Sequence, residues 1–276
     1  MNIAAIFRAE GDIVDIYKKT LKRLLEDKVL DLDDKILVVA GGSGDRNSFH
    51  NLGFRNVIIS NIQAHAGVVD YTPYEWIYQD AEALTVEDSS YDWVFVHAAL
   101  HHCASPHKAL CEMFRASNKG VGVFEARDSL FMKIAIKLKL TVSYELEPAA
   151  LSNGTAYGYR DTTIPNYVYR WTEREVEKTI NSYAPSHEHR FRYFYGLAAP
   201  TQRLAMSPNL IKRIMGKLIQ VATPVFETLL PKQGNEFSFV VQKNQVLQPW
   251  LEKKGDDIMP NMDYLKRRFN IEKYVN

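Results

Sequence analysis

The chain has 276 residues, of which 46% are apolar and 24% are charged, a composition typical of globular proteins. A formal net charge of +1 gives no electrostatic basis for binding nucleic acid, so we expect none. The sequence contains no apolar run of about 18 residues, so we predict no membrane-spanning helix. The length is sufficient for one large domain that carries an insertion.

The N-terminal residues and the two cysteines indicate the cellular compartment. The first residues, MNIAAIFRAEGD, include acidic side chains too early for a secretory signal. Cys103 and Cys111 lie on one predicted helical segment, and we expect both to be free thiols in a reducing compartment. The expected location is therefore the cytoplasm.

Strands and helices are predicted to alternate from residue 35 to residue 140. Apolar residues at helical spacing predict the helices, and short apolar runs predict the strands. The predicted order is a helix over 10–27, a strand over 35–40, a helix over 45–52 ended by Gly53, a strand over 56–60, a short helix around Tyr74, Trp76 and Ile77, a strand over 92–96, a helix over 105–116, a strand over 120–125 and a helix over 129–140. This alternation indicates the α/β class, with an open parallel sheet and helices on both faces.

The second half of the chain follows a different pattern. Residues 141–170 are rich in turn-forming residues and tyrosine, and lack clean periodicity. A helix is predicted over 172–182, where Thr172 and Glu175 form a capping box. Helices interrupted by Pro224 are predicted over 207–230, and a strand over 237–241 is expected to return to the sheet antiparallel to it.

The segment ILVVAGGSGD, from Ile36 to Asp45, is the most informative stretch. Its apolar run is typical of a parallel strand buried on both faces. The glycines that follow allow a sharp turn and a close approach of the backbone to a ligand. This pattern indicates a nucleotide-type site at the carboxyl edge of the sheet. A dehydrogenase would need GxGxxG in register, and GGSGDR does not supply it.

Polar residues follow the other predicted strands. Asp80 follows the third strand, whereas His97, His101 and His102 follow the fourth strand. Because right-handed crossovers place every carboxyl end at one edge, these residues are expected to meet in one crevice.

The motifs carry a resemblance to a known family. GGSG, then DAEALTVEDSSYDWVFVHAALHHCASPHKALCEMFR, then a fifth strand ending in Glu125 resemble class I S-adenosylmethionine-dependent methyltransferases, in the branch that acts on small molecules. The resemblance covers about residues 35–127. It implies a Rossmann-like sheet, mostly parallel with one antiparallel strand, and S-adenosylmethionine as the cofactor.

The resemblance also implies cofactor contacts, residue by residue. Ala40, Gly41, Gly42 and Gly44 would hold the amino-acid end, Asn61 the ribose, Asp80 and Ala81 the adenine amine, and His97 and Ala98 would flank the sulfonium. Two positions depart from the family pattern: Val38 and Ala40 stand where an acidic residue and the first glycine usually occur. Asp45, directly after the loop, is the candidate replacement for the acid.

A hydroxyl acceptor requires a general base, and histidine titrates in the useful range. The candidates are His97, His101 and His102, together with Glu125. A structural hydrogen-bonding role for these histidines remains an alternative. A metal held by the histidines with Asp92 or Asp128 has no ligand spacing to support it, so we expect no metal.

The segment that follows the sheet residues is the candidate substrate-binding region. Aromatic faces pack on sugar rings, and arginines bind phosphates or carboxylates. The candidates are Tyr157, Tyr159, Arg160, Tyr167, Tyr169, Arg170 and Trp171. His187 and His189, beside two arginines, could bind an anionic group, but an exposed polar segment is the favoured interpretation.

These predictions divide the chain into three parts. Residues 1–140 would form an N-terminal helix and the cofactor-binding core, residues 141–235 a helical and aromatic substrate-binding cap, and residues 236–276 the last strand and a tail. IPNYVYRWTEREV and NEFSFVVQK look like methyltransferases of surface-polysaccharide and sugar pathways. The resemblance therefore implies methyl transfer to a small molecule, foremost to a hydroxyl of a sugar or glycan precursor.

Two other functions stay open at this point. One is methylation of nitrogen or carbon on a secondary metabolite. The other is a non-catalytic subunit that binds S-adenosylmethionine without turnover. The expected partner is a small-molecule substrate, and a homodimer is an open alternative for the assembly.

Overall fold

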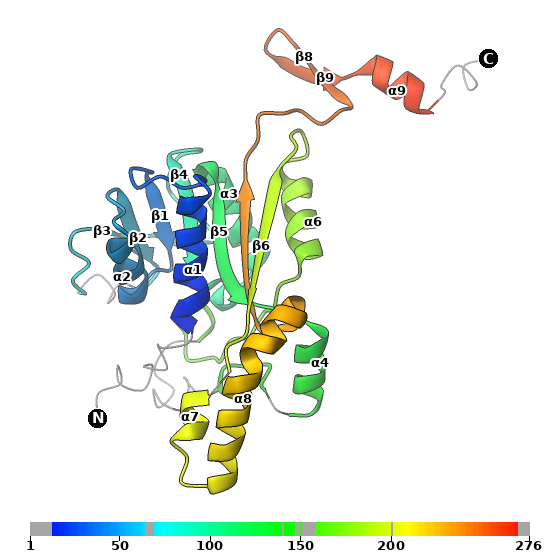
Figure 1. Cartoon of the computed structure of the whole chain (residues 1–276). Helices are drawn as coiled ribbons and strands as arrows, with labels where there is room; N and C mark the ends of the chain where they lie inside the picture. Colours follow the sequence, from blue (N-terminus) through cyan, green and yellow to red (C-terminus); the bar gives the residue numbers. More distant parts are fainter. Residues whose placement is uncertain are drawn as a thin grey trace.

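A computed structural model describes residues 13–63, 69–139, 141–146, 150, 158–199 and 201–269. A seven-stranded sheet forms the centre of the molecule, with helices on both faces (Figure 1). A separate two-stranded hairpin and a short helix lie at the C-terminal end of the described chain.

The sheet is parallel except for one strand. Its spatial order is β3 (Glu75–Tyr78), β2 (Val57–Asn61), β1 (Ile36–Val39), β4 (Tyr91–His97), β5 (Ser117–Ala126), β7 (Glu236–Gln242) and β6 (Arg190–Gly196). Only β7 runs antiparallel to its neighbours β5 and β6. This arrangement confirms the predicted mostly parallel sheet with one antiparallel strand. The carboxyl ends of the six parallel strands share one edge.

Two helical layers cover the sheet. Tyr17 and Leu21 of α1 (Ile13–Glu26) and Phe49 of α2 (Ser43–Leu52) pack in a core with Val38 and Phe95. On the other face, α3 (Pro106–Ala116) and α6 (Glu173–Tyr183) pack in a second core with the opposite side chains of the same strands.

Local signals in the sequence explain where several helices begin and end. The Ser105 hydroxyl accepts a hydrogen bond from the Lys108 amide at the start of α3. Thr172 and Glu175 form the predicted capping box of α6. Gly53 ends α2 with a φ of 85°, a left-handed conformation that favours glycine.

Further elements lie around the carboxyl edge and beyond the sheet. They are the 3₁₀ helices η3 (Leu100–His102), η4 (Tyr159–Asp161) and η5 (Pro231–Gln233), the helices α4 (Leu130–Lys137), α7 (Thr201–Ala205), α8 (Leu210–Leu229) and α9 (Met262–Phe269), and the strands β8 (Leu251–Lys254) and β9 (Asp257–Pro260). Helix α8 continues through Pro224, so the predicted interruption there is wrong. A proline removes one backbone hydrogen bond from a helix, but the residues on both sides of Pro224 remain helical.

The structure corrects the sequence analysis at both edges of the sheet. The predicted short helix around Trp76 is the edge strand β3, which pairs in parallel with β2. Its sequence, EWIY, is aromatic and β-branched, which suits a strand. Strand β6 lies in the sheet beside β7, within the segment for which the sequence indicated a cap.

No helix among the described residues combines the length and the apolar character needed to cross a bilayer.

Trp171 tests how strongly the second core holds the fold. The side chain is fully buried and packs against Phe239 and His107. We expect Trp171→Ala to lower the free energy of unfolding by about 3–5 kcal/mol, because it leaves a large cavity. Urea denaturation followed by circular dichroism measures the change. Trp250→Ala, at a side chain that is 43% exposed, is the matched control and should cost less than about 1 kcal/mol. Equal losses in both variants would contradict this assignment.

Candidate functional site

A cavity of about 200 Å³ lies at the carboxyl edge of the sheet, beside the ends of β1, β2 and β4. Residues distant in the sequence meet there. The lining residues are Ala40, Asn61, Ile62, Gln63, Gln79, Asp80, Ala81, Glu82, His97, Ala98, Ala99, His102, Cys103, Gly158, Arg160 and Asp161. Asp80, His97 and His102, which the sequence analysis placed in one crevice, all line this cavity, whereas Gly41, Gly42, Gly44 and His101 are not among its lining residues.

The ends of β1 and β4 turn sharply beside this cavity. Ala40 and Ala98 both have a φ of 50°, a left-handed conformation that is costly for residues other than glycine. Ala40 stands where the family usually has its first glycine, and its backbone takes a conformation that glycine adopts readily. Strained backbone of this kind clusters at binding sites.

The glycines after β1 have different local environments. A Cβ on Gly41 would lie 2.9 Å from Val38 Cγ1 and 3.0 Å from Ile59 Cγ2, so close packing favours glycine there. A Cβ on Gly42 or Gly44 would meet no atom within 4 Å among the described residues. The Gly42 amide donates to the Asp45 carboxylate, which fixes the start of α2.

Asn61 connects the loops that follow β1 and β2. Its Nδ2 donates to the carbonyl of Gly41, and its Oδ1 accepts from the amide of Gln63. The side chain lines the cavity while holding both loops in place.

Asp80 forms an acidic wall of the cavity together with Glu82. The Oδ1 atom of Asp80 accepts from the Glu82 amide, and its Oδ2 accepts from Arg160 Nη2 at 2.7 Å. Glu82 in turn accepts from the amides of Ala104 and Ser105, and it pairs with Arg160. Arg160, predicted as a substrate contact, thus lies against the carboxylate predicted to bind adenine. Each carboxylate oxygen has a further lone pair, so Asp80 can still accept from an amine.

A second acidic group lies near the end of β4. Asp45 Oδ1 is 3.7 Å from His97 Nδ1, and the His97 ring stacks on the Tyr17 ring with centroids 4.5 Å apart. Asp45 Oδ1 and the Tyr17 hydroxyl are both buried, and the two groups interact with each other. Burial, followed by the negative charge of Asp45, raises the pKa of Tyr17. The sequence analysis did not single out Tyr17, whose ring meets His97 only through tertiary packing.

Glu125, at the end of β5, organises the loop after β4. It accepts from the amides of Ala99 and Leu100 and from His101 Nδ1, the last at 2.7 Å. His101 Nε2 lies 3.4 Å from a carboxylate oxygen of Glu145. Burial acts to lower the pKa of His101, but the two carboxylates outweigh it and raise the pKa to about 10. His101 is therefore a buried imidazolium at neutral pH.

His102 differs from its neighbour in exposure and charge. Its side chain lines the cavity and is 32% exposed. Burial, followed by the positive charge of His101, lowers the pKa of His102. Its Nδ1 lies 3.4 Å from the carbonyl of Gly158, and its Nε2 lies 3.6 Å from a carboxylate oxygen of Glu145. At neutral pH His102 is a neutral imidazole beside the cavity.

Glu145 lies close to both His101 and His102, which the spacing of the sequence did not predict. Possible ligand atoms of His101, His102 and Glu145 lie within 4.8 Å of one another, a separation that an ion could bridge. A metal ligand must be a neutral imidazole, so an ion here would have to displace the proton of His101. Of the two acids considered in the sequence analysis, Asp92 is at the amino end of β4, opposite the histidines, and pairs with Lys119, whereas Asp128 pairs with Lys133.

The remaining substrate-binding candidates lie in several different places. Tyr159 belongs to η4 beside the cavity. Tyr169 donates to Glu175 of α6, and Arg170 donates to backbone carbonyls. Trp171 is fully buried in the second core and therefore cannot contact a substrate, contrary to the prediction. Tyr157 lies outside the described residues.

The histidines of SHEHR have local partners. His187 Nδ1 lies 2.9 Å from the Ser186 hydroxyl, and His189 Nε2 lies 2.9 Å from the carbonyl of Ala184. His189 also contacts the Phe114 ring. These contacts are within the fold rather than at a cavity. Cys103 and Cys111 are free thiols, as expected.

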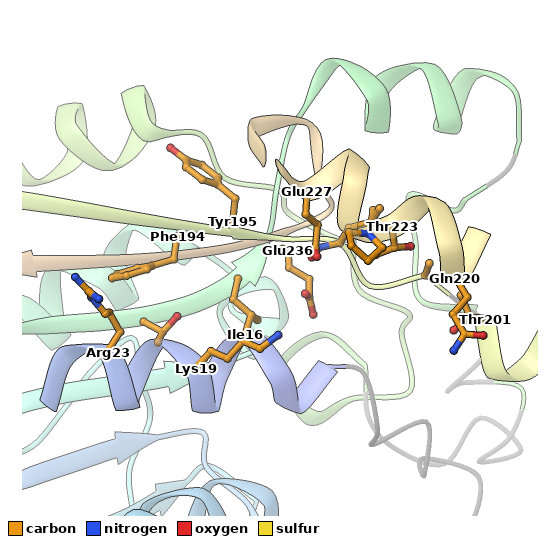
Figure 2. A pocket seen from close by; sticks show the side chains of 15 residues that line it. Ile16, Lys19, Arg23, Phe194, Tyr195, Thr201, Gln220, Thr223, Glu227 and Glu236 are labelled. Carbon is orange, nitrogen blue, oxygen red and sulfur yellow. The ribbon is translucent and has the colours of Figure 1, made fainter. Parts of the chain in front are cut away.

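A larger pocket of about 420 Å³ lies between α1, β6 and α8 (Figure 2). Ile16, Lys19 and Arg23 of α1 face Phe194 and Tyr195 of β6 across it. Thr223 and Glu227 of α8 close a third side. None of the residues predicted to bind cofactor or substrate lines this pocket.

Comparisons with known proteins agree with this geometry. Residues 54–124 match a family described as a methyltransferase domain. Over these residues the chain is similar to a methyltransferase domain, and its sheet has the class I methyltransferase fold. It is a methyltransferase whose cofactor is S-adenosylmethionine. A search of curated proteins found no match to the sequence.

Solved structures of methyltransferases share the fold. A SAM-dependent methyltransferase from Archaeoglobus fulgidus superposes with a TM-score of 0.52 and 12% identity, covering 88% of this chain and 100% of the other. A SAM-dependent methyltransferase from Thermotoga maritima, described as a possible histamine N-methyltransferase, superposes with a TM-score of 0.50 and 12% identity, covering 88% and 96%. At 12% identity these similarities establish the fold of this chain and nothing about its substrate.

The described residues fit parts of S-adenosylmethionine. The Asp80 carboxylate lines the cavity and suits the adenine amine, whereas Asp45, the acid that would suit an ammonium group, is not among the lining residues. The open space over Gly42 and Gly44 leaves the loop backbone accessible. Ala40 and Ala98 present only methyl groups to the cavity, which leaves room between the strand ends.

The charge of His101 predicts a pH dependence of stability. Because its folded pKa of about 10 exceeds the unfolded value of about 6.5, the stabilisation is complete below about pH 6.5. It is lost progressively as the pH rises towards 10. We expect the free-energy difference between wild type and His101→Asn to shrink across this window, as measured by urea denaturation. Wild-type and variant curves that stay parallel would show that His101 is neutral in the fold. His50→Asn, at an exposed position, is the control.

Proposed function

We propose that this methyltransferase transfers a methyl group to a hydroxyl of a small molecule, foremost a sugar or glycan precursor. The observation that carries the proposal is a neutral His102 beside the cavity, next to the buried imidazolium of His101. A hydroxyl needs a base to remove its proton, and a neutral imidazole supplies one at neutral pH.

The residues around the cavity have separable tasks in this proposal. Bound S-adenosylmethionine supplies a methyl group activated by the sulfonium. Asp80 and the loop after β1 orient the cofactor, and the small side chain of Ala98 leaves space for the acceptor. His102 Nε2 takes the proton of the acceptor hydroxyl. Most of the rate would come from holding the two reactants in line.

His101 and Glu125 act on His102 rather than on the substrate. The His101 ring lies beside the His102 ring, with centroids 4.5 Å apart. Its positive charge disfavours a second positive charge on His102 in the resting state, which leaves the base unprotonated. Glu145 Oε2, 3.6 Å from His102 Nε2, can stabilise the charge that appears when His102 takes a proton.

A sugar acceptor is supported by the chemistry of the segment beside the cavity. Tyr159 is 38% exposed and offers an aromatic face. Arg160 and Asp161 also line the cavity and offer polar groups that match sugar hydroxyls. Acidic Asp80 and Glu82 already pair with Arg160, so this arginine is less available for an anionic acceptor.

Binding of the cofactor tests the first part of the proposal. We expect Asp80→Asn to weaken S-adenosylmethionine binding by about tenfold or more, because a hydrogen bond to a charged acceptor is lost. Isothermal titration calorimetry measures the affinity. Asp88→Asn is the control, since Asp88 is 77% exposed and lies outside the cavity. If the wild-type fold is intact and binds neither S-adenosylmethionine nor its demethylated product, the cofactor assignment is wrong.

The role of His102 separates the candidate acceptors. We expect His102→Ala to lower kcat by about 10²–10⁴-fold with unchanged cofactor affinity if the acceptor atom is a hydroxyl oxygen. An amine acceptor depends less on a base, so near-normal turnover in this variant would favour nitrogen methylation. Mass spectrometry of products from a panel of sugars, nucleotide sugars and amines gives the readout. His50→Ala is the control. Cofactor binding without turnover on any acceptor would favour the non-catalytic alternative.

A further inference from the structure

Helix α8 is amphipathic, but its apolar face points away from the protein. Apolar residues at helical spacing form one half of its surface, and polar residues the other half. The apolar side chains, each at least half exposed, are Leu210, Ile211, Ile214, Met215, Leu218, Val221, Val225 and Leu229. An amphipathic surface helix of a globular protein normally buries this face.

The polar face of α8 lines a pocket, while the half-buried Phe226 packs on α4. Gln220, Thr223 and Glu227 line the 420 Å³ pocket and lie towards α1 and β6 (Figure 2). Gly216 is buried, and a Cβ there would lie 2.8 Å from Leu204 of α7. The orientation of α8 is thus fixed by its polar and small residues, and the apolar face is left uncovered by the described residues.

Helix α4 extends the same surface. Phe131 of α4 contacts Phe226 of α8, with ring centroids 5.6 Å apart. Met132 and Ala135 of α4 are buried, whereas the other apolar side chains of its exposed side are Leu130, Phe131, Ile134 and Leu138. We call these four residues and the eight of α8 the α4–α8 surface. Many large apolar side chains exposed on neighbouring helices indicate an interaction site.

The charges around the α4–α8 surface indicate what covers it. Helix α8 carries Arg213 and Lys217 among its exposed apolar residues, and its one acidic residue, Glu227, lies near its C-terminal end and lines the 420 Å³ pocket. Beside α4, Lys137 and Lys139 are exposed, whereas Lys133 pairs with Asp128. The protein as a whole has a net charge of only +1, so this positive charge is local. Apolar residues flanked by cations are typical of helices that lie in the headgroup region of anionic membranes.

A second copy of the chain suits this surface less well. Two copies facing each other through it would bring two sets of cations together, and like charges across an interface are costly. An anionic bilayer instead supplies both an apolar layer and complementary charge. We propose that the α4–α8 surface binds peripherally to a membrane containing anionic lipid, with both helices lying on the bilayer.

This attachment would orient the sheet. Helices α4 and α8 lie beyond the carboxyl end of β5 in Figure 1, at the edge of the sheet that also carries the cofactor cavity. The edge at which methyl transfer takes place therefore faces the bilayer, whereas the β8–β9 hairpin lies at the far end of the molecule.

Vesicle flotation tests the proposal on the full-length chain. We expect the protein to float with vesicles of phosphatidylcholine and phosphatidylglycerol, and at least about tenfold less with phosphatidylcholine alone. Added salt should weaken the binding, because it screens the charges. Leu218→Asp with Val221→Asp should abolish flotation. Arg213→Glu with Lys217→Glu should reduce the apparent affinity by about tenfold or more.

Matched controls come from the hairpin at the far end. Ile258→Asp, at a side chain that is 46% exposed, and Lys253→Glu, also at an exposed position, should leave flotation unchanged. Circular dichroism and S-adenosylmethionine binding report whether each variant is folded.

Two results would overturn the proposal. One is the absence of wild-type binding to anionic vesicles at low salt. The other is a wild-type dimer in sedimentation velocity that dissociates in the Leu218→Asp, Val221→Asp variant, without any vesicle binding, because this would make the surface an interface between copies.

Discussion

The carboxylate of Glu125 holds the reaction edge of this methyltransferase together. It lies at the end of β5, fully buried, and it accepts hydrogen bonds from two consecutive backbone amides of the loop after β4. The same carboxylate binds His101. A buried carboxylate needs compensating charge and hydrogen bonds, and here the protonated imidazole and the amides provide both. The loop that carries His97, Ala98 and His102 is thereby fixed against the neighbouring strand.

The pair of Glu125 and His101 also affects the protonation state of His102, which lines the cavity. Glu125 and Glu145 raise the pKa of His101, whereas burial, followed by the charge of His101, lowers the pKa of His102. The surroundings of these two adjacent histidines therefore keep one protonated and the other neutral. The distinction cannot be made from HH in the sequence, because it depends on Glu125 and Glu145, which come from distant parts of the chain.

The sequence predicted the parts of the fold that rest on local patterns. Alternating apolar strands and amphipathic helices, the Thr172 capping box and the left-handed Gly53 each follow from nearby residues. The edge strands were harder to predict, because β3 and β6 are only half buried and their pairing partners lie elsewhere in the sequence. Within the site, convergence of strand ends predicted the crevice, but not the ion pair of Arg160 with Asp80 or the stacking of Tyr17 on His97. Such contacts depend on tertiary packing.

Cys103 shares the cavity with the positions assigned to the cofactor. Burial, followed by the nearby charges of Glu82, Glu125 and Asp80, raises the pKa of its thiol to about 12. Thiolates rather than thiols attack electrophilic carbon. A cysteine ionised at neutral pH would itself be open to methylation by the donor. Burial and the carboxylates around the cavity instead keep Cys103 as a thiol, which is a poor nucleophile.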